Sequence, residues 1–266
     1  MRTILLIGAG GGMGTACARM FSESGDCVIG LDREGTAVPD GVRFLPIDVT
    51  DPGAADRMAA ALSKEEVRLD AICYMAGVYD TDSLIEIDEQ RMRRIFEVNV
   101  FGAYRAIKAL IPLLNPNGRI VLVTSELAPL DPLPFTGLYG ITKGTLEDYA
   151  FSLAMELQLL GVSVSVIRPG AVQTPLIDRS VERIESFAAN TAHYPECAER
   201  FLYVTHKVES KCVPPEAVAK KLLRILSAKR PRFLYTLNTS PLLKLYGILP
   251  KQIKLWAIKT YLKRRS

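Results

Sequence analysis

Short apolar runs rich in β-branched residues recur along the chain, with segments of helical spacing between them. This alternation is typical of successive strand–helix–strand units. Because parallel strands need long crossover connections that pack on the sheet, it predicts an α/β protein with a doubly wound parallel sheet in three layers. The predicted strands are Thr3–Ile7, Cys27–Leu31, Arg43–Ile47, Ala71–Met75, Arg119–Thr124 and Val162–Ile167.

The 266 residues divide into one predicted domain, residues 1–239, and a tail. A chain of this length can bury one large core, and its 48% hydrophobic and 23% charged residues exclude a disordered or fibrous protein. The strand pattern is lost at about 173–212, which is too long for a plain connection and predicts a lid over the substrate. Residues 240–266 are predicted to form a basic, amphipathic helical tail.

The start of the chain and its cysteines predict a cytoplasmic protein. The apolar start ends at Gly8 and is too short for a signal peptide, and no stretch reaches about 18 uninterrupted apolar residues. The five cysteines are widely spaced and form no Cys-x-x-Cys pair, so we expect reduced thiols and no metal site. We also expect no nucleic-acid partner.

Five glycines lie between residues 8 and 14, after the first predicted strand and at the start of a helical segment. Such a turn can adopt positive φ and lets the backbone approach a pyrophosphate, to which the helix N-terminus offers free amides. An ordinary tight turn is the alternative. We expect Gly8, Gly12, Met13 and Gly14 to bind a dinucleotide, as in a Rossmann fold.

The second predicted strand runs into Asp32, where a dinucleotide-binding fold places the acid that binds the adenosine ribose. A carboxylate there accepts hydrogen bonds from the ribose hydroxyls and repels a 2′-phosphate, which favours NAD over NADP. Arg33 is the competing signal, because an arginine at this turn can bind a phosphate. A solvated surface charge is the other interpretation of Arg33.

Tyr139 and Lys143 lie four residues apart and therefore on one face of a helix. Proton transfer by a tyrosine near neutral pH requires about 4 kcal/mol of preference for the phenolate, which Lys143 and a nicotinamide cation could supply. Ser125 follows a predicted strand, at the edge where open α/β sheets bind ligands. The alternatives are surface packing for the Tyr/Lys pair and a turn or cap role for the serine.

Taken in order, these motifs resemble the short-chain dehydrogenase/reductase family over residues 1 to about 235. Gly8, Gly12 and Gly14 match its glycine motif, with Ile7 in place of a threonine. The further matches are Asp48 and Val49 in the adenine pocket, Ala76 and Gly77 at a strand end, the helix asparagine Asn99, Ser125, Tyr139, Lys143, and the nicotinamide turn Pro169-Gly170 followed by Val172 and Thr174.

The resemblance implies an oxidoreductase that transfers a hydride between NAD(H) and a secondary alcohol or ketone. Tyr139 would exchange the proton, and Ser125 would hold the substrate oxygen. Lys143 would bind the nicotinamide ribose and lower the pKa of the tyrosine, and Asn99 would hold a water that links Lys143 to solvent. A non-catalytic dinucleotide-binding regulator is the alternative function on the same fold.

Two positions depart from the family pattern. Tyr74-Met75 replaces an Asn-Asn pair that braces neighbouring strands in the family, so we expect a structural compensation there. The spacing from Ser125 to Tyr139 is one residue longer than the commonest family spacing, and Glu126 takes the usual register of the serine. We nevertheless predict Ser125 as the catalytic serine.

Apolar residues fill the segment between Ser125 and Tyr139, which the family places beside the substrate. They predict an apolar substrate, steroid-, retinoid- or acyl-like, and packing against the helix is the alternative. The residues are Leu127, Leu130, Leu133, Pro134 and Phe135.

The tail combines apolar residues with lysines and arginines and contains no acid. One interpretation is a helix that lies on an anionic membrane surface, so that the protein would be peripheral to a membrane. The other is that the tail closes the substrate pocket or packs across a subunit boundary. We expect a homo-oligomer, a dimer or a tetramer.

Overall fold

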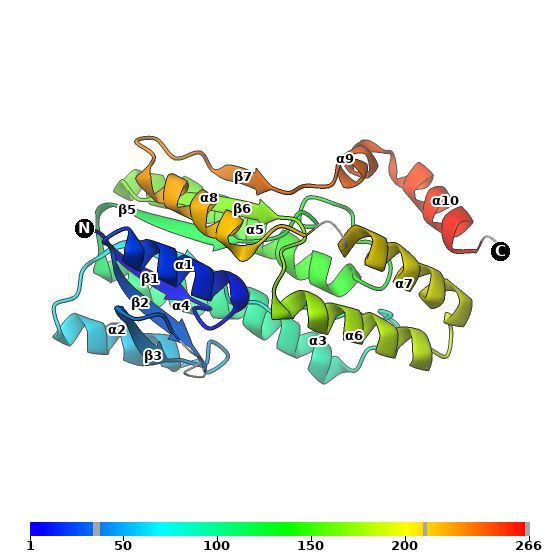
Figure 1. The fold of residues 1–266 in the computed structure, drawn as a ribbon, viewed down its shortest axis with the longest axis horizontal. Coiled ribbons are helices and arrows are strands. Elements are labelled where there is room, and N and C mark those ends of the chain that lie inside the picture. The colour runs from blue at the N-terminus through cyan, green and yellow to red at the C-terminus, as the bar shows by residue number, and fades with distance from the viewer. Residues whose placement is uncertain (34–37, 210–211, 264–266) are drawn as a thin grey trace.

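A seven-stranded, wholly parallel sheet forms the centre of the protein, as the computed structural model of residues 1–33, 38–209 and 212–263 shows (Figure 1). The strand order is β3-β2-β1-β4-β5-β6-β7, so the predicted doubly wound sheet is confirmed. The chain adds β2 and β3 on one side of β1, then returns to the other side of β1 and adds β4 to β7 there. The strands are β1 (Thr3–Ile7), β2 (Cys27–Asp32), β3 (Val42–Pro46), β4 (Leu69–Tyr74), β5 (Leu114–Val123), β6 (Ser163–Pro169) and β7 (Leu234–Leu237).

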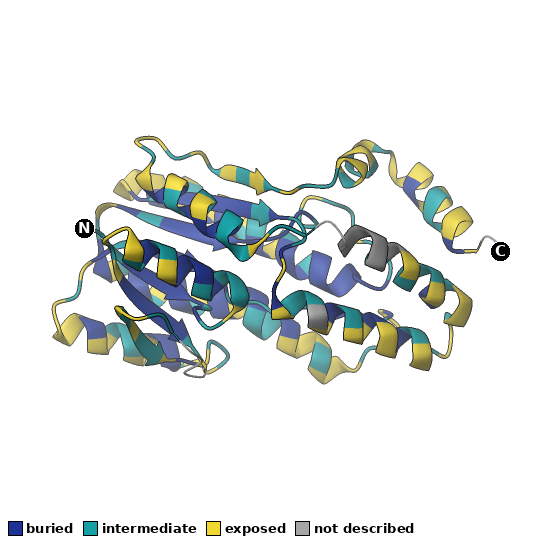
Figure 2. Cartoon of the chain, in the orientation of Figure 1, coloured by how far each residue is buried: buried dark blue, intermediate teal, exposed yellow. Residues whose placement is uncertain are grey.

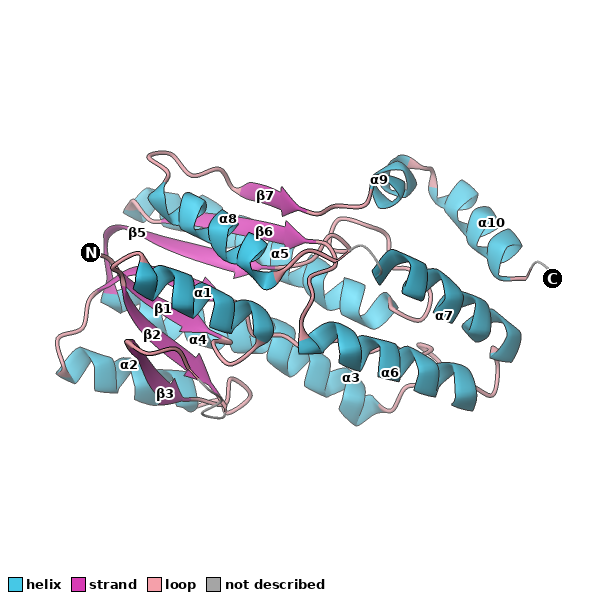
Figure 3. Ribbon diagram, in the orientation of Figure 1, coloured by secondary structure: helices cyan, strands magenta, loops and turns pink. Residues whose placement is uncertain are grey.

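Helices cover both faces of the sheet and make three layers (Figure 3). The α-helices are α1 (Gly12–Glu23), α2 (Ala54–Lys64), α3 (Glu89–Phe96), α4 (Gly102–Leu110), α5 (Gly137–Leu157), α6 (Pro175–Asn190), α7 (Pro195–Glu209), α8 (Pro215–Ser227), α9 (Pro241–Ile248) and α10 (Lys251–Leu262). A π-helical turn, η1 (Glu97–Phe101), joins α3 to α4, and the 3₁₀ turns η2 (Ile111–Leu113) and η3 (Gln158–Leu160) follow α4 and α5.

Strand β1 contributes side chains to two hydrophobic cores, one on each face of the sheet. Ile4 and Leu6 pack with α1 and α8, whereas Leu5 and Ile7 pack with α2, α4 and α5 on the other face. Successive side chains of a strand point to opposite faces, so a strand covered on both sides is apolar at every position. The buried strands stand out in the centre of the molecule (Figure 2).

The seventh strand, β7, is absent from the sequence-based prediction. Its four residues pair in parallel with the end of β6, at the edge of the sheet, and alternate between exposed and half-buried positions. Such a short edge strand lacks the continuous apolar run that marks the inner strands.

The predicted lid and tail are both helical and lie beyond the carboxyl ends of the strands (Figure 1). The lid contains α6 and α7, and the tail contains α9 and α10 after a break at Pro250. Residues 210–211 of the lid, and Arg264 and Arg265 of the tail, lie outside the described residues. No helix in the described part of the chain is long and apolar enough to cross a membrane.

Tyr74 provides the structural compensation expected where the family has an asparagine. Its ring is fully buried at the end of β4, and its hydroxyl donates a 2.7 Å hydrogen bond to the carbonyl of Val98 in η1. The phenol thereby ties the strand end to the turn that carries Asn99. Gly102 is necessary here, because a Cβ on it would lie 2.7 Å from the Tyr74 hydroxyl.

Candidate active site

The glycine turn after β1 leaves no room for a side chain at Gly8, Gly12 or Gly14. Gly8 has a φ of +90°, and a Cβ on it would lie 2.6 Å from the backbone nitrogen of Ala76 at the end of β4. A Cβ on Gly14 would lie 2.0 Å from the carbonyl oxygen of Gly8, and one on Gly12 would lie 2.8 Å from Thr174 Cγ2. The turn therefore packs backbone against backbone at the N-terminus of α1, which is the geometry that receives a phosphate.

A cavity of about 810 Å³ opens beside this turn, at the carboxyl ends of β1, β2, β3 and β4. Its position is the one at which a doubly wound sheet binds a dinucleotide. The predicted cofactor residues that line it are Gly8, Gly12, Met13, Gly14, Asp32, Arg33, Asp48, Val49, Ala76, Gly77 and Thr174. The shape and the donors of this cavity thus fit a nicotinamide dinucleotide.

Asp32 lies at the end of β2 and is anchored by backbone amides. Its carboxylate accepts hydrogen bonds from the nitrogens of Gly10, at 2.9 Å, and Arg33, at 2.7 Å. These bonds hold the carboxylate against the glycine turn, on the lining of the cavity.

Three basic residues of the cavity were missed by the sequence analysis. Arg93 and Arg94 come from α3, and Arg179 comes from α6. Arg93 and Arg94 could have been found in the sequence, since they end a run of polar residues on a predicted helix just before Asn99. Only the fold shows that they face the same cavity as Asp32.

Asp48 is a second carboxylate at this end of the cavity. Partial burial would raise its pKa, but hydrogen bonds from the amide and hydroxyl of Thr50, together with the charges of Arg33 and Arg94, hold the pKa below its usual value. Asp48 is therefore a permanent anion that partly neutralises the surrounding arginines.

Tyr139, Lys143 and Ser125 come together behind the cavity. The phenol and the ammonium project from the same face of α5, with Lys143 Nζ 5.8 Å from the centre of the Tyr139 ring. Ser125 immediately follows β5 and Thr124, and its hydroxyl lies close enough to the Tyr139 phenol to lower the pKa of that phenol. Glu126, which has the register of the family's serine, points elsewhere: its carboxylate accepts a 2.7 Å hydrogen bond from the amide of Ser240.

The ionisation of this cluster differs from the sequence-based expectation. Burial raises the pKa of Tyr139 to about 12, and the group that lowers it is Ser125 rather than Lys143. Burial also lowers the pKa of Lys143 to about 8. The side chains are so well shielded from water that desolvation outweighs their proximity.

Gly77 lies between the dinucleotide cavity and the ammonium of Lys143. A Cβ on this residue would lie 3.1 Å from Lys143 Nζ and 3.4 Å from Asn99 Oδ1. Gly77 lines the cavity itself. The lysine ammonium is thus separated from the dinucleotide cavity by the thickness of one glycine backbone, and it donates a 3.2 Å hydrogen bond to the carbonyl of Val123.

Asn99 is fully buried in η1, and its side chain is already engaged. Its Oδ1 accepts from the amide of Val78 at 2.8 Å, and its Nδ2 donates to the Val78 carbonyl and to Thr142 Oγ1, both at 3.0 Å. Thr142 lies between Tyr139 and Lys143 on α5. Asn99 therefore braces α5 against the segment that follows β4, and a water relay through its side-chain amide would have to break these bonds.

The nicotinamide turn predicted after β6 does not line the cavity. Pro169 pairs with Leu237 of β7, and the amide of Gly170 donates to the Leu237 carbonyl at 2.8 Å. Val172 is buried in the core and bridges to Val213. Of this segment, only Thr174 reaches the cavity.

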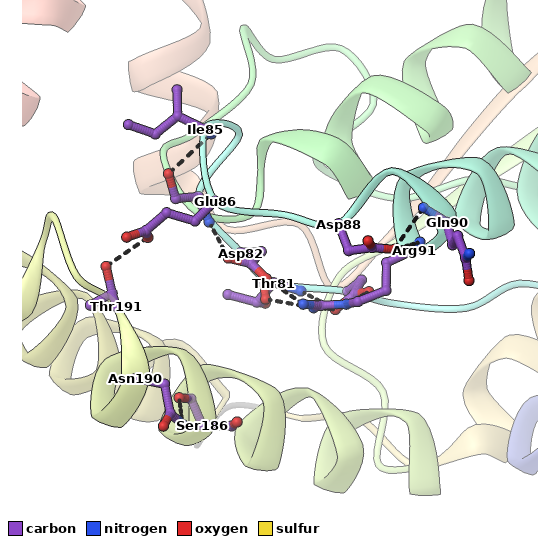
Figure 4. A network of polar contacts seen from close by, with 12 residues as sticks. Thr81, Asp82, Ile85, Glu86, Asp88, Gln90, Arg91, Ser186, Asn190 and Thr191 are labelled. Carbon is purple, nitrogen blue, oxygen red and sulfur yellow. Dashed lines mark hydrogen bonds and ion pairs between the residues drawn. The ribbon is translucent and has the colours of Figure 1, made fainter.

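The lid is fastened to the loop between β4 and α3 by charged groups (Figure 4). Glu86 accepts a 2.8 Å hydrogen bond from Thr191 Oγ1, after α6, and also accepts from the next two backbone amides. Arg91 in turn pairs with Asp80, at 2.6 Å, and with Asp82 in the same loop. The segment that leads into α7 is therefore held against the loop between β4 and α3.

Comparison with known proteins agrees with this geometry. The sequence profile described as short chain dehydrogenase matches residues 2–185. The chain belongs to the short-chain dehydrogenase/reductase family. It is accordingly an oxidoreductase that uses a nicotinamide dinucleotide, as members of this family do, and the family resemblance seen in the motifs is confirmed.

The relatives of this chain are named for different reactions. The chain is 26% identical over 232 residues to a 3-ketodihydrosphingosine reductase of Bacteroides thetaiotaomicron, covering 86% of this chain and 85% of that protein. It is 33% identical over 181 residues to a 1-hydroxy-2-glutathionyl-2-methyl-3-butene dehydrogenase of Rhodococcus, covering 66% and 80%. The aldohexose dehydrogenase of Thermoplasma acidophilum has the same fold, with a TM-score of 0.75 at 20% identity, covering 94% of this chain and 96% of that one.

Proposed function

We propose that the protein interconverts a secondary alcohol and a ketone with NAD(H), and that Tyr139 is the proton-transfer residue. The observation that carries the proposal is the position of Lys143, whose ammonium lies directly behind Gly77 at the wall of the dinucleotide cavity, with Tyr139 beside it on α5 and Ser125 next to the phenol. A non-catalytic regulator would have no need for a buried phenol, hydroxyl and ammonium at that place.

The buried hydroxyls would handle the proton and the substrate oxygen. The hydroxyl of Ser125 lies next to the Tyr139 phenol, so both can reach one carbonyl or alcohol oxygen. When bound, the nicotinamide accepts or donates the hydride, and its oxidised form adds a positive charge near the phenol. Tyr139 transfers a proton efficiently only when its pKa comes down from about 12, so a nearby cation is needed for the reaction.

Lys143 supports this step from the other side of Gly77. Its ammonium lies within reach of the cavity wall and holds the Val123 carbonyl at the end of β5. With a pKa of about 8 it is largely protonated at neutral pH and can bind ribose hydroxyls. We propose that it orients the nicotinamide end of the cofactor.

Asp32 favours NAD over NADP. The anchored carboxylate stands on the cavity lining, where it would accept hydrogen bonds from the adenosine ribose and repel a 2′-phosphate. Arg33 and Arg94 are the residues that would bind that phosphate instead. Both already face Asp48, whose negative charge offsets theirs.

An apolar substrate agrees with the surroundings of Tyr139. The ring packs among apolar side chains, including Val78, Ile95 and Leu127, and lies 4.8 Å from the ring of Tyr79. Phe135 instead packs with the aromatic rings of α6 and α7, and Leu130 lies against Gly247 of α9. The Bacteroides relative is named for the reduction of a lipid ketone, which supports a substrate with an acyl-like chain.

A kinetic comparison tests the proposal. Secondary alcohols and ketones of increasing alkyl length would be assayed with NAD(H) and with NADP(H). We expect higher kcat/KM for the longer chains and for NAD(H). Binding of NAD(H) without turnover of any alcohol or ketone would contradict the proposal and favour the regulator.

A further inference from the structure

The inner face of the tail is folded against the substrate side of the site. Lys254 of α10 is buried, pairs with Asp131 at 2.8 Å, and lies 5.1 Å from the centre of the Tyr246 ring. Leu262 is buried in a cluster with Phe135, which lies in the segment between Ser125 and Tyr139. The tail is therefore a fixed part of the structure, and its outer face is a defined surface.

The side of the tail that does not pack on the rest of the protein carries many large apolar side chains. They are each at least 45% exposed and follow one another along both helices, and scattered single exposures would not produce such a run. They are Leu242, Leu245, Ile248, Ile253, Leu255, Trp256 and Tyr261, with exposed fractions of 68%, 56%, 79%, 45%, 65%, 66% and 51%. We call these residues the outer tail surface.

Cations border the outer tail surface. Lys244, Lys251, Lys259 and Lys263 are exposed, Lys251 with 84% of its side chain, and residues 240–263 contain no Asp or Glu. Aliphatic and aromatic side chains interspersed with lysines are the composition that binds an anionic lipid surface, where the apolar groups enter the acyl boundary and the ammonium groups meet the head groups.

A second copy of the chain fits this surface less well. Two identical tails in a symmetric contact would bring Lys244, Lys259 and Lys263 of both copies together, and residues 240–263 contain no carboxylate to pair with them. The repulsion would oppose the gain from apolar burial. A surface that is itself negatively charged provides the complement that the tail lacks.

We propose that the outer tail surface docks on an anionic lipid bilayer. The tail lies at the carboxyl ends of the strands, together with α6 and α7, so docking would place the substrate side of the site next to the membrane (Figure 1). The proposal rests on the exposed surface and its charge and is independent of the proposed substrate.

The test measures binding of the full-length protein to vesicles of phosphatidylcholine with and without phosphatidylserine. Trp256 is the only tryptophan, so its fluorescence reports the tail directly. We expect the protein to co-sediment with the anionic vesicles and the emission of Trp256 to shift to shorter wavelength. Absence of both effects would overturn the proposal.

Paired variants locate the contact. Leu245→Glu with Leu255→Glu should lower binding to anionic vesicles at least about tenfold, and Lys251→Gln with Lys259→Gln should do so most clearly at low salt. The control is Leu159→Glu with Leu160→Glu, since these leucines are 82% and 70% exposed but lie in η3, before β6. Equal loss in the control would contradict a specific tail contact.

Sedimentation velocity without vesicles distinguishes a second copy. If the parent is an oligomer, Leu245→Glu with Leu255→Glu should leave its mass unchanged. Dissociation of that oligomer by the same pair would assign the surface to a subunit contact and overturn the lipid proposal. Circular dichroism and the retained activity of each variant establish that it is folded.

Discussion

The nucleotide half and the substrate half of the site are built in different ways. In the nucleotide half, the functional residues follow directly after the strands: the glycine turn after β1, Asp32 at the end of β2, and Ala76 and Gly77 soon after β4. In the substrate half, separate segments are joined by side-chain contacts over long sequence distances. Glu86 and Thr191, Glu126 and Ser240, and Asp131 and Lys254 are 105, 114 and 123 residues apart.

The nucleotide half is therefore determined by backbone geometry, whereas the substrate half is determined by packing between distant segments. The nucleotide half depends on close approaches of main chain that only glycine permits, so a single added methyl group should disrupt it. The substrate half depends on several side-chain contacts between distant segments, so the loss of one contact leaves the others in place. Tyr139 lies where the two halves meet, and the largest effect is expected there.

Replacement of the phenol hydroxyl should have the largest effect on catalysis. Tyr139→Phe removes the proton-transfer group and leaves the ring packed on Tyr79, so we expect kcat to fall about 10²-fold or more. Titration of NAD(H) fluorescence should give an unchanged Kd. Turnover within a few-fold of the parent would rule out Tyr139 as the proton-transfer residue.

Gly14 in the glycine turn should not be replaceable even by alanine. In Gly14→Ala the new Cβ would lie 2.0 Å from the carbonyl oxygen of Gly8, so the turn must shift and NAD(H) affinity should fall at least about tenfold. Gly11→Ala is the matched control, because its Cβ would lie 3.5 Å from that same oxygen and its φ is −75°. Isothermal titration of both variants measures the difference, and similar affinities would argue against the backbone description of this half.

Removal of the Asp32 carboxylate should change cofactor preference. Asp32→Ala abolishes the repulsion of a 2′-phosphate next to Arg33, so kcat/KM with NADP(H) relative to NAD(H) should rise several-fold to about tenfold. Steady-state kinetics with both cofactors provide the ratio. A parent enzyme that already prefers NADP(H) would show that the arginines, not Asp32, decide the choice.

The buried ammonium of Lys143 should make stability depend on pH. Its pKa falls from an ordinary 10.5 to about 8 in the folded protein, so the unfolded chain binds more protons between these values. Stability therefore rises with pH across this window, by about 3 kcal/mol for this group alone. Urea unfolding of the parent and Lys143→Met at pH 7.5 and pH 10 should show this rise only in the parent. The same pH dependence in the parent and in Lys143→Met would contradict a lowered pKa of Lys143.

The smallest effect is expected at the tail contact. Asp131→Asn leaves Lys254 buried without its carboxylate and should lower the free energy of unfolding. Lys251→Gln removes an exposed partner 3.8 Å from the same carboxylate and should change it very little. Thermal unfolding compares the two, and equal shifts would mean that burial of Lys254 does not matter.

Much of this site could be predicted because its signals are local. The spacing of Tyr139 and Lys143 on one helix turn, and the position of Ser125 after a strand, require only the periodicities of helix and sheet. The choice between Ser125 and Glu126 was harder, since the two are adjacent. The fold separates them by directing one side chain to Tyr139 and the other to Ser240.

By itself the sequence determined the parallel sheet, the glycine turn and the order of the catalytic residues, because apolar periodicity and glycine spacing act over a few residues. Tertiary structure alone decided that Arg93, Arg94 and Arg179 share a cavity with Asp32. It also decided that burial dominates the pKa of Tyr139 and that one face of the tail packs while the other is exposed. These properties depend on which distant segments come together and how much water they exclude, and no local pattern encodes that.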